Sequence, residues 1–435
     1  MRQDTGISRR QFLQGSAAAA GTFALGGLSA NLAFGKGSDA FKVGLIGCGG
    51  RGTGAAADCL AAAAELKVDL NIVALADAFA DRVKGAKDRF KVADARCFTG
   101  LDAYRKLIAT DVNLVILATP PGFRPLHFAE AVEAGKNVFM EKPVAVDPTG
   151  VRSVIETSAL ADEKKLGVVA GTQRRHQAAY IETIKRIHDG MIGEIVSAQC
   201  YWNQGGLWVH KRGPNESDVA WQIRNWLYFV WLSGDHIVEQ HVHNLDVINW
   251  AVNAMPERVV AMGGRQARTA PEFGNIYDHF CVEFVYPKEC RTISMCRQID
   301  GADNRVSERV AGTKGVSDCC GTIKDHKDNV LWKYEGENPN PYVVEHKDLL
   351  SSIRDGKPLN EGKRIAESTM CAVMGRISAY AGREFATEWA MKKCGLDLFP
   401  KDLKMDGQLP VEPVARPGVT KLEDLKEPPK RKKGK

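Results

Sequence analysis

Short apolar runs alternate with amphipathic stretches along the first half of the chain. Apolar runs bounded by polar and turn residues are typical of strands that are buried on both faces. They predict strands over residues 41–46, 71–76, 94–98, 114–117, 137–140 and 167–170. Helical spacing of apolar residues predicts helices over residues 55–66, 80–92, 102–108, 126–134 and 147–161. Strands that alternate with helices predict a doubly wound parallel sheet, which binds ligands at the carboxyl ends of its strands.

The second half has a different pattern. Strands separated by Gly, Asn, Asp and Pro are predicted over residues 196–202, 258–264, 280–286, 292–298 and 306–311. Helices are predicted over residues 234–252, 342–354 and 361–381. Beyond Pro400 the chain is rich in Pro and Lys and has no strong periodicity, so we expect residues 401–435 to be an extended or disordered tail.

Positive charge is concentrated at the two ends of the chain. The formal net charge of +6 over 435 residues is exceeded by residues 1–35 and Lys430–Lys435 together. The body between them is therefore close to neutral, which argues against a nucleic-acid partner. The eleven cysteines include no C-x-x-C spacing, and we expect reduced, mostly buried thiols, with the pair Cys319-Cys320 in a strand.

The N-terminus carries an export motif. Residues Ser8–Leu13 read S-R-R-Q-F-L and precede an Ala- and Gly-rich stretch over residues 16–34. This resembles a twin-arginine signal, so we take residues 1–35 as a targeting segment that is removed on export. It implies the twin-arginine export machinery as a partner, a periplasmic or otherwise exported protein, and no stable membrane insertion after cleavage.

A glycine fingerprint follows the first predicted strand. It is a G-x-G-x-x-G of Gly47, Gly49 and Gly52, with Gly50 and Arg51 inside it, and a helix follows. In this context the glycines allow a tight turn and let a pyrophosphate approach the helix N-terminus. Asp77 ends the next strand, where a carboxylate accepts hydrogen bonds from a ribose diol and repels a 2′-phosphate. We therefore expect NAD, with NADP as the less favoured alternative.

Two later motifs add to the fingerprint. They are Thr119-Pro120 with His127, and Glu141-Lys142-Pro143 after a later strand. Together the three motifs resemble the Gfo/Idh/MocA family (glucose–fructose oxidoreductase, inositol dehydrogenase and rhizopine-catabolism proteins). The resemblance extends over residues 42–389.

The resemblance has consequences for fold and cofactor. It implies an N-terminal Rossmann domain, residues 36–175, and a C-terminal α/β domain with a large open-faced, mainly antiparallel sheet, residues 176–400. The second domain carries the substrate and often an oligomer interface, so a homo-oligomer is expected. The implied cofactor-binding positions are the fingerprint residues and Asp77 together with Thr119, Pro120, His127, Glu141 and Lys142.

The predicted helix over residues 234–252 carries the candidate catalytic groups. On one helix His236, Glu239 and His243 share a face. By the resemblance, Glu239 is the acid and His243 the following histidine of the family site. His243 would act as the base for a hydroxyl proton, Lys142 would hydrogen-bond the reacting oxygen, and Glu239 would bind substrate hydroxyls or orient His243. A divalent metal on His236, Glu239 and His243 is a rival interpretation, but the spacing matches no metal motif and we expect no metal.

Further positions are candidates for substrate binding. Five of the eight Trp residues lie between Tyr201 and Trp231, and aromatic faces stack on sugars, so Trp208 is a candidate contact. Packing under a long loop is the alternative. Arg174 and His176 follow a predicted strand and should face the cleft. His236 and Asp246, which flank the candidate base, complete the set.

These features predict an exported NAD(P)-dependent oxidoreductase that acts on a CH–OH group of a sugar or sugar derivative. A cofactor outside the cytoplasm cannot exchange with a free pool, so we expect it to be tightly bound and recycled in place, with the N-terminal arm covering the adenine. One alternative is an NAD-dependent glycoside-cleaving enzyme that oxidises C3 transiently and then eliminates. A second alternative is a non-catalytic exported sugar-binding protein.

Overall fold

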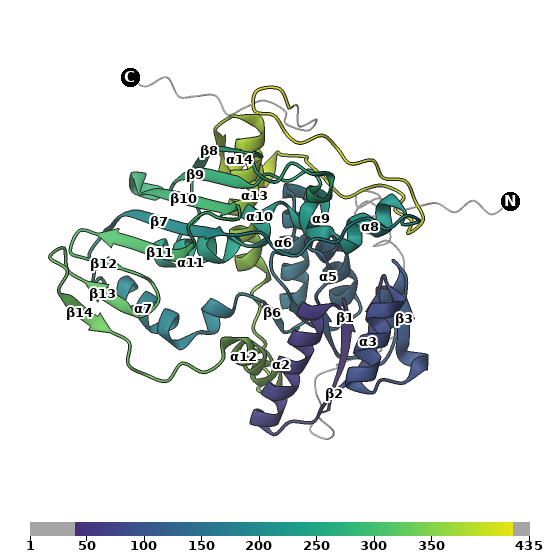
Figure 1. Ribbon diagram of the computed structural model, residues 1–435. Coiled ribbons are helices and arrows are strands. Elements are labelled where there is room, and N and C mark those ends of the chain that lie inside the picture. Colours follow the sequence, from purple (N-terminus) through teal and green to yellow (C-terminus); the bar gives the residue numbers. More distant parts are fainter. Residues whose placement is uncertain (1–39, 421–435) are drawn as a thin grey trace, which may run out of the picture.

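The structure is a computed structural model that describes residues 40–420. Its first layer is a six-stranded parallel sheet with the strand order β3-β2-β1-β4-β5-β6 (Figure 1). The strands are β1 (Phe41–Ile46), β2 (Leu70–Asp77), β3 (Cys97–Thr99), β4 (Leu114–Leu117), β5 (Asn137–Met140) and β6 (Val168–Ala170). This order confirms the predicted Rossmann sheet, in which the central strands are buried on both faces.

Helices cover both faces of this sheet. Side chains of α2 (Gly50–Leu66), α3 (Ala80–Phe90) and α12 (Pro341–Arg354) form one apolar cluster with the sheet. Side chains of α4 (Ala103–Ile108), α5 (Arg124–Glu133) and α6 (Pro148–Glu163) belong to the cluster on the other face. The third strand is shorter than predicted, because residues 94–96 form a 3₁₀ turn and only the end of β2 is available for pairing.

The second layer is a nine-stranded sheet with the order β14-β13-β12-β11-β7-β10-β9-β8-β15. The strands are β7 (Ile195–Gln204), β8 (Arg258–Gly264), β9 (His279–Val285), β10 (Arg291–Gln298), β11 (Arg305–Gly312), β12 (Val316–Ser317), β13 (Thr322–Lys324), β14 (Val330–Lys333) and β15 (Phe385–Ala386). Only the pair β7–β10 is parallel. The predicted mainly antiparallel sheet is thereby confirmed.

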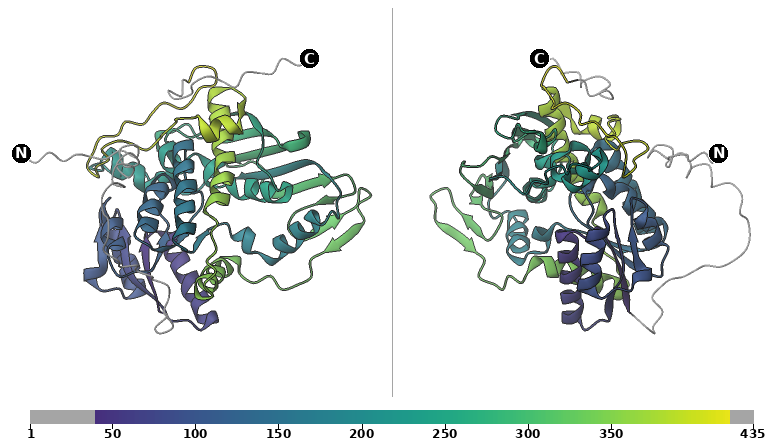
Figure 2. Two further views of the ribbon diagram at one scale, coloured as in Figure 1. Left: turned by 180° about the vertical axis from the view of Figure 1, so that it is seen from behind. Right: turned by 45° about the vertical axis from the view of Figure 1, so that its right-hand side comes forward.

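One face of the second sheet is covered and the other is open. Helices α11 (Val242–Val252) and α13 (Gly362–Ala381) pack on the covered face. On the other face the side chains of Val260, Met262 and Met295 are exposed. Helix α13 also packs against α6, so it connects the two layers (Figure 2).

After β14 the chain returns to the first sheet. Helix α12 packs on α2, and the Leu359 carbonyl accepts a hydrogen bond from the Val168 N–H of β6. Residues 341–359, which we expected in the second domain, therefore contact the first sheet. The domain ranges expected from the sequence stay a prediction.

The cysteines are all free, as expected. The prediction that Cys319 and Cys320 belong to a strand is wrong, because they lie in the turn between β12 and β13. The Ser317 hydroxyl accepts the Cys319 N–H, and the Asp318 carboxylate accepts the Cys320 N–H. Such local side-chain bonds stabilise a turn in competition with a sheet.

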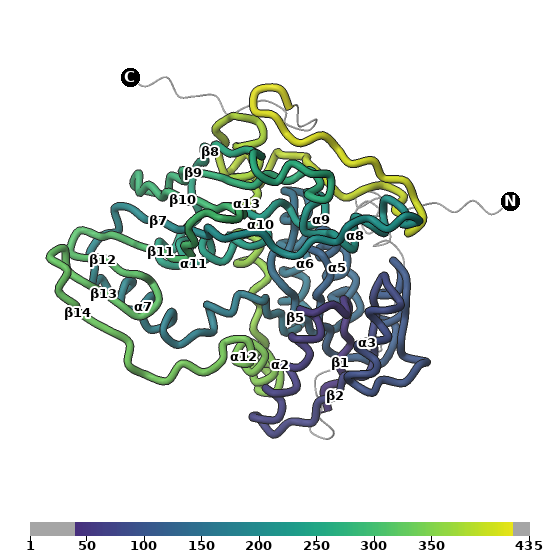
Figure 3. The backbone as a smooth tube through the Cα atoms, viewed as in Figure 1, coloured from purple at the N-terminus to yellow at the C-terminus, as the bar shows by residue number. Residues whose placement is uncertain are grey.

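The C-terminal chain is extended, as predicted, but it packs on the body of the protein. We define residues 398–409 as the C-terminal strap; it runs beside α8 (Asp218–Arg224), as Figure 3 shows. Its apolar side chains join a cluster with Trp221, Phe229 and Trp231. Residues 421–435, like the predicted targeting segment, lie outside the described range. Among residues 40–420 no helix has the length and apolar character that a bilayer crossing requires.

Candidate active site

The glycine fingerprint forms the turn between β1 and α2. Gly47 has a φ of +97°, and a Cβ there would lie 2.6 Å from the backbone of Ala118. A Cβ on Gly52 would lie 1.8 Å from the Gly47 carbonyl oxygen, so this glycine lets α2 pack closely. Around Gly49 and Gly50 the space is open. The loop thus leaves room for a phosphate at a helix N-terminus, where N–H groups have no partner inside the helix.

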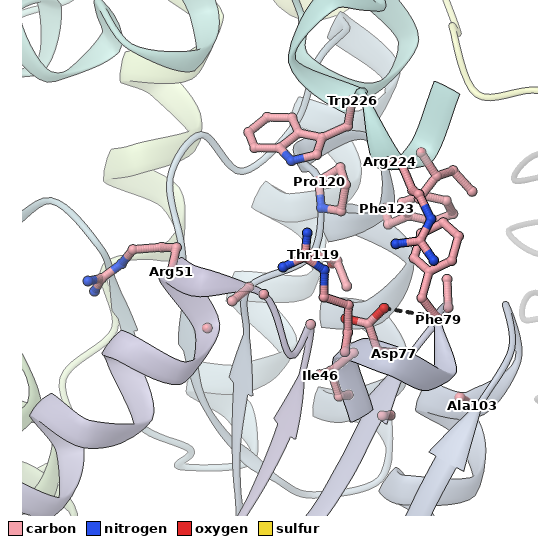
Figure 4. A pocket seen from close by; sticks show the side chains of 18 of the residues that line it. Ile46, Arg51, Asp77, Phe79, Ala103, Thr119, Pro120, Phe123, Arg224 and Trp226 are labelled. Carbon is pink, nitrogen blue, oxygen red and sulfur yellow. Dashed lines mark hydrogen bonds between the residues drawn. The ribbon is translucent and has the colours of Figure 1, made fainter. Parts of the chain in front are cut away.

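A pocket of about 540 Å³ lies over this loop (Figure 4). Most of the predicted cofactor residues line it, namely Gly47, Gly49, Gly50, Arg51, Gly52, Asp77, Thr119, Pro120 and His127. The Thr119 hydroxyl lies 3.1 Å from His127 Nδ1. Burial, together with nearby arginines, lowers the pKa of His127 to about 3, so this ring is neutral.

Asp77 occupies the end of β2 and points into the pocket (Figure 4). Its carboxylate accepts hydrogen bonds from the Cys48 N–H at 2.7 Å and from the Phe79 N–H at 2.9 Å. Burial raises the pKa of Asp77, and this effect outweighs the two hydrogen bonds, which by themselves would lower that pKa. Each oxygen keeps lone-pair capacity for a further donor. These features and the glycine cradle fit the adenosine and pyrophosphate parts of a dinucleotide.

Arg51 lines the pocket, and its role as a cofactor contact stays a prediction. Its side chain points away from the pocket (Figure 4), where its Nε donates to Glu141 at 2.5 Å and its guanidinium lies 3.8 Å from Glu345. The ion pair with Glu141 holds it there. Glu141 thus fixes the position of the Arg51 guanidinium.

A second cluster forms where β5 ends. Thr119-Pro120 and Glu141-Lys142 follow β4 and β5, which pair in parallel with Leu117 opposite Met140. They therefore lie side by side at the same sheet edge. The Lys142 ammonium donates to the Glu239 carbonyl at 2.5 Å and lies 3.2 Å from its carboxylate.

The predicted single helix over residues 234–252 is wrong. The structure contains α10 (His236–Glu239) and α11, separated by Gln240 and His241. The Glu239 carbonyl accepts a hydrogen bond from the Lys142 ammonium. The His243 N–H, which would donate to this carbonyl in a continuous helix, donates to the Gln240 carbonyl. The ammonium thus occupies the carbonyl that a continuous helix would use. His236, Glu239 and His243 consequently do not share one helix face.

His243 is buried beside cationic groups. Its ring stacks on Trp202 at 5.7 Å, and its Nδ1 has no hydrogen-bond partner among the described residues. Burial lowers the pKa of His243 well below its usual value, and the charges of Lys142, Arg174 and Arg51 lower it further. A neutral imidazole is the form that accepts a proton.

Arg174 lies in the same cluster. Its guanidinium lies over Trp202 at 5.7 Å and forms an ion pair with the buried Glu308 of β11. Tyr180 donates to the second oxygen of Glu308 at 3.3 Å. Arg174 therefore has a fixed position near His243, and its role as a substrate contact stays a prediction.

The other predicted substrate residues lie elsewhere. Asp246 is buried in ion pairs with Arg175 and Arg364, and His176 is held by Asp348 at 2.6 Å. His236 is fully buried and lies 3.0 Å from Asp235. Trp208 lines the nucleotide pocket instead of the Lys142 cluster. The sequence marked all four as polar or aromatic neighbours of the site but could not orient them.

The rival metal interpretation gains no geometric support. Within residues 40–420, no three His, Cys, Asp or Glu side chains gather in a group suited to a metal ion.

Several pocket residues were missed from the sequence. They are Phe79, Leu101, Tyr104, His210 and Arg224. Phe79 comes two residues after Asp77, so its place near a ribose was open to inference. Nothing in the local sequence connects Arg224 to residues so far away along the chain.

Models of known families match most of the chain. A model described as "Oxidoreductase family, NAD-binding Rossmann fold" matches residues 41–171, and the "GFO/IDH/MocA C-terminal domain" model matches residues 180–317. A model of the twin-arginine translocation signal matches residues 6–26. The last match confirms the predicted export through the twin-arginine pathway.

Individual relatives agree with these matches. The 2,7-anhydro-N-acetylneuraminate hydratase of Mediterraneibacter gnavus is 28% identical over 57% of this chain and 64% of its own length. The inositol 2-dehydrogenase of Rhizobium meliloti is 25% identical over 57% of this chain and 67% of its own length. A levoglucosan dehydrogenase structure, in complex with NADH and levoglucosan, shares the fold with a TM-score of 0.64 at 17% identity, covering 80% of this chain and 99% of that one.

Proposed function

Since this chain belongs to the Gfo/Idh/MocA family of NAD-binding oxidoreductases, we propose that it oxidises or reduces a sugar or sugar derivative with a cofactor that stays bound. The observation that carries this is the cluster of Lys142, Glu239 and His243 beside the sheet edge that also forms the nucleotide pocket. The similarity to an inositol dehydrogenase supports a hydroxyl-bearing ring as substrate.

The chemistry follows from the three side chains. A nicotinamide bound at the ends of β4 and β5 would supply the hydride acceptor. Neutral His243 takes the hydroxyl proton while the Lys142 ammonium donates a hydrogen bond to the same oxygen. Glu239 holds Lys142 in place and offers its carboxylate to neighbouring hydroxyls. In the reverse direction His243 returns the proton to the carbonyl oxygen.

We favour NAD over NADP because the Asp77 carboxylate faces the pocket and would repel a 2′-phosphate. Export through the twin-arginine pathway supports a cofactor that is loaded before export and recycled in place. We also expect a homo-oligomer, since the second sheet has one uncovered face.

A test of this proposal starts from the purified full-length chain. After exhaustive dialysis the protein is denatured, and the supernatant is analysed by mass spectrometry. We expect stoichiometric NAD or NADH. Sugars and cyclitols are then screened for a change in the bound-cofactor absorbance. An empty protein that works only with added NAD would contradict the retained cofactor, and one that neither contains nor binds nicotinamide would contradict the proposal itself.

A second candidate function is favoured by one relative. The printed name of the Mediterraneibacter gnavus relative is that of a hydratase, which implies a reaction without net oxidation. We therefore keep a glycoside-cleaving reaction through transient C3 oxidation as the alternative. Release of an aryl group from an aryl glycoside, with no net change in bound cofactor, would favour it. Because the family is one of oxidoreductases, the non-catalytic interpretation falls away.

A further inference from the structure

Part of the nucleotide pocket is built by the second domain. We define residues 205–231, which follow β7 and end within α9 (Val230–Ser233), as the roof segment. The side chains that it places around the pocket are Trp208, Val209, His210, Ile223, Arg224 and Trp226. Figure 4 shows Trp226 and Arg224 extending from this segment toward Pro120 and Phe79 of the Rossmann domain. The Rossmann strands by themselves would leave this side of the pocket open.

The roof segment is fixed to the Rossmann domain beside Asp77. Arg224 donates to both carboxylate oxygens of Asp81, at 2.8 and 3.1 Å, and its guanidinium lies 3.9 Å from the centre of the Phe79 ring. Phe123 packs edge-on against Trp231 at 5.9 Å. These contacts connect the segments that follow β2 and β4, between which the adenosine of a dinucleotide lies.

The C-terminal strap holds the roof segment from outside. The Gln222 amide donates to the Leu409 carbonyl at 2.5 Å, and the Leu409 N–H donates to Asp218 at 2.9 Å. Phe399 of the strap packs on Phe123 at 5.4 Å. Roof, strap and Rossmann residues thus form one apolar cluster at the edge of the pocket.

Two tryptophans of the roof are available to a ligand. Trp208 is 49% exposed and lies 6.1 Å from Trp226, ring centre to ring centre. Trp226 is only partly buried, and both side chains line the pocket. Aromatic side chains provide stacking surface for a nucleic-acid base.

We propose that the roof segment is the second half of the adenosine site, with Trp208 and Trp226 contacting the adenine and Arg224 anchoring the roof over the ribose. This inference rests on the proposed function and names the elements that retain the cofactor. The adenosine can leave only when the roof separates from Asp81 and Phe79. Exchange is therefore slow, and loading precedes the closure of the strap. The N-terminal arm that we expected over the adenine lies outside the described residues.

The test measures cofactor release from the full-length protein. Bound NADH is chased with excess NAD, and its fluorescence decay gives the release rate for Trp208→Ala, Trp226→Ala and Arg224→Gln. We expect release to be about tenfold faster or more, because removing a base-stacking ring weakens binding by about that factor. ADP-ribose should bind correspondingly more weakly to the emptied proteins.

Two matched controls separate this from a general loss of structure. Trp332→Ala removes a tryptophan on β14, and Arg212→Gln removes an arginine of the roof segment whose partner is Asp218; both should release NADH at the wild-type rate. Trp208 is half exposed, so its replacement tests the idea without disturbing the core. Wild-type release rates in all three pocket variants would overturn the adenosine roof and leave the proposed function standing. A wild-type protein that binds neither NADH nor ADP-ribose would overturn the proposed function.

Discussion

The ammonium of Lys142 lies 3.2 Å from the carboxylate of Glu239 and 2.5 Å from the carbonyl oxygen of the same residue. The two residues are 97 positions apart in the sequence and come from different domains. Both side chains are 13% exposed, so the pair is shielded from bulk water yet open toward the cluster around His243. The contact fixes the position of the lysine and interrupts the helix that would otherwise continue to His243.

Replacing Lys142 should remove turnover without removing the cofactor. Lys142→Met keeps the length of the side chain but abolishes the ammonium that contacts Glu239. We expect the rate of sugar oxidation to fall about a hundredfold or more, on the scale of a lost transition-state hydrogen bond. Nicotinamide content after dialysis should match that of the wild type. Lys185→Met, on the surface, is the control, and near wild-type turnover in Lys142→Met would rule out the proposed role.

Replacing His243 should slow hydride transfer. His243→Ala removes the group assigned as base, and we expect a decrease of about 10²–10⁴-fold in the reduction rate of bound cofactor. His236→Ala, at a histidine held by Asp235, should cost far less activity. The opposite order of effects would mean that the base is misassigned, and activity in His243→Ala that a chelator abolishes would favour the metal alternative.

The pH dependence offers a test that needs no variant. Burial and the neighbouring cations Lys142, Arg174 and Arg51 lower the pKa of His243 well below 6.5. The active form is the neutral ring, which stays almost fully populated until the pH approaches that lowered pKa. The single-turnover rate should therefore stay flat as pH falls through 6.5 and decline only at more acidic pH. A rate that halves near pH 6.5 would contradict the assignment.

The choice between NAD and NADP should depend on Asp77. Asp77→Asn removes the negative charge, while the amide oxygen still accepts one of the two backbone N–H bonds from Cys48 and Phe79. We expect the preference for NAD to decrease about tenfold or more, since one unit of lost charge repulsion is worth over 1 kcal/mol at a partly buried site. Titration of the emptied protein with both nucleotides measures this. Asp69→Asn serves as the control, and NADP in the protein as purified would contradict the premise.

Asp246 should matter for stability more than for substrate. Burial would raise the pKa of Asp246, but the guanidinium groups of Arg175 and Arg364 lower it to about 2. Asp246→Ala leaves the buried Arg175 without its carboxylate partner and Arg364 with Glu361 alone, so we expect the free energy of unfolding to fall by about 3–5 kcal/mol. Denaturant unfolding at equal cofactor content measures the loss.

The exposed ion pairs of Asp111 with Lys42 and Arg96 are the comparison for Asp246. Asp111→Ala should cost about 1 kcal/mol or less, because exposed ion pairs contribute little. Equal effects of the two substitutions would show that the Asp246 network adds nothing beyond a surface pair, and reopen its assignment to the substrate.

The sequence alone determined the nucleotide-binding half. The strand, glycine and helix order at residues 41–66 is local, and Gly47 and Gly52 answer steric demands from the end of the adjacent strand and from the loop itself. Parallel strands then bring Thr119 and Lys142 to the same edge by pairing alone. Local periodicity and the rules of βα topology were therefore sufficient for the sheet and the glycine loop, whereas Lys142 was singled out by the family resemblance of its motif.

The tertiary structure alone decided how the second domain meets that half. Helical spacing predicted one helix over residues 234–252, but the Lys142 ammonium takes the Glu239 carbonyl and divides it. Composition suggested a sugar site at the aromatic segment. The contacts of Arg224 and Trp226 instead place this segment over the nucleotide pocket. In both cases the deciding contact joins residues that no local pattern relates. A hydrogen bond or ion pair across the domain interface outweighs the weak helix and packing preferences of either segment.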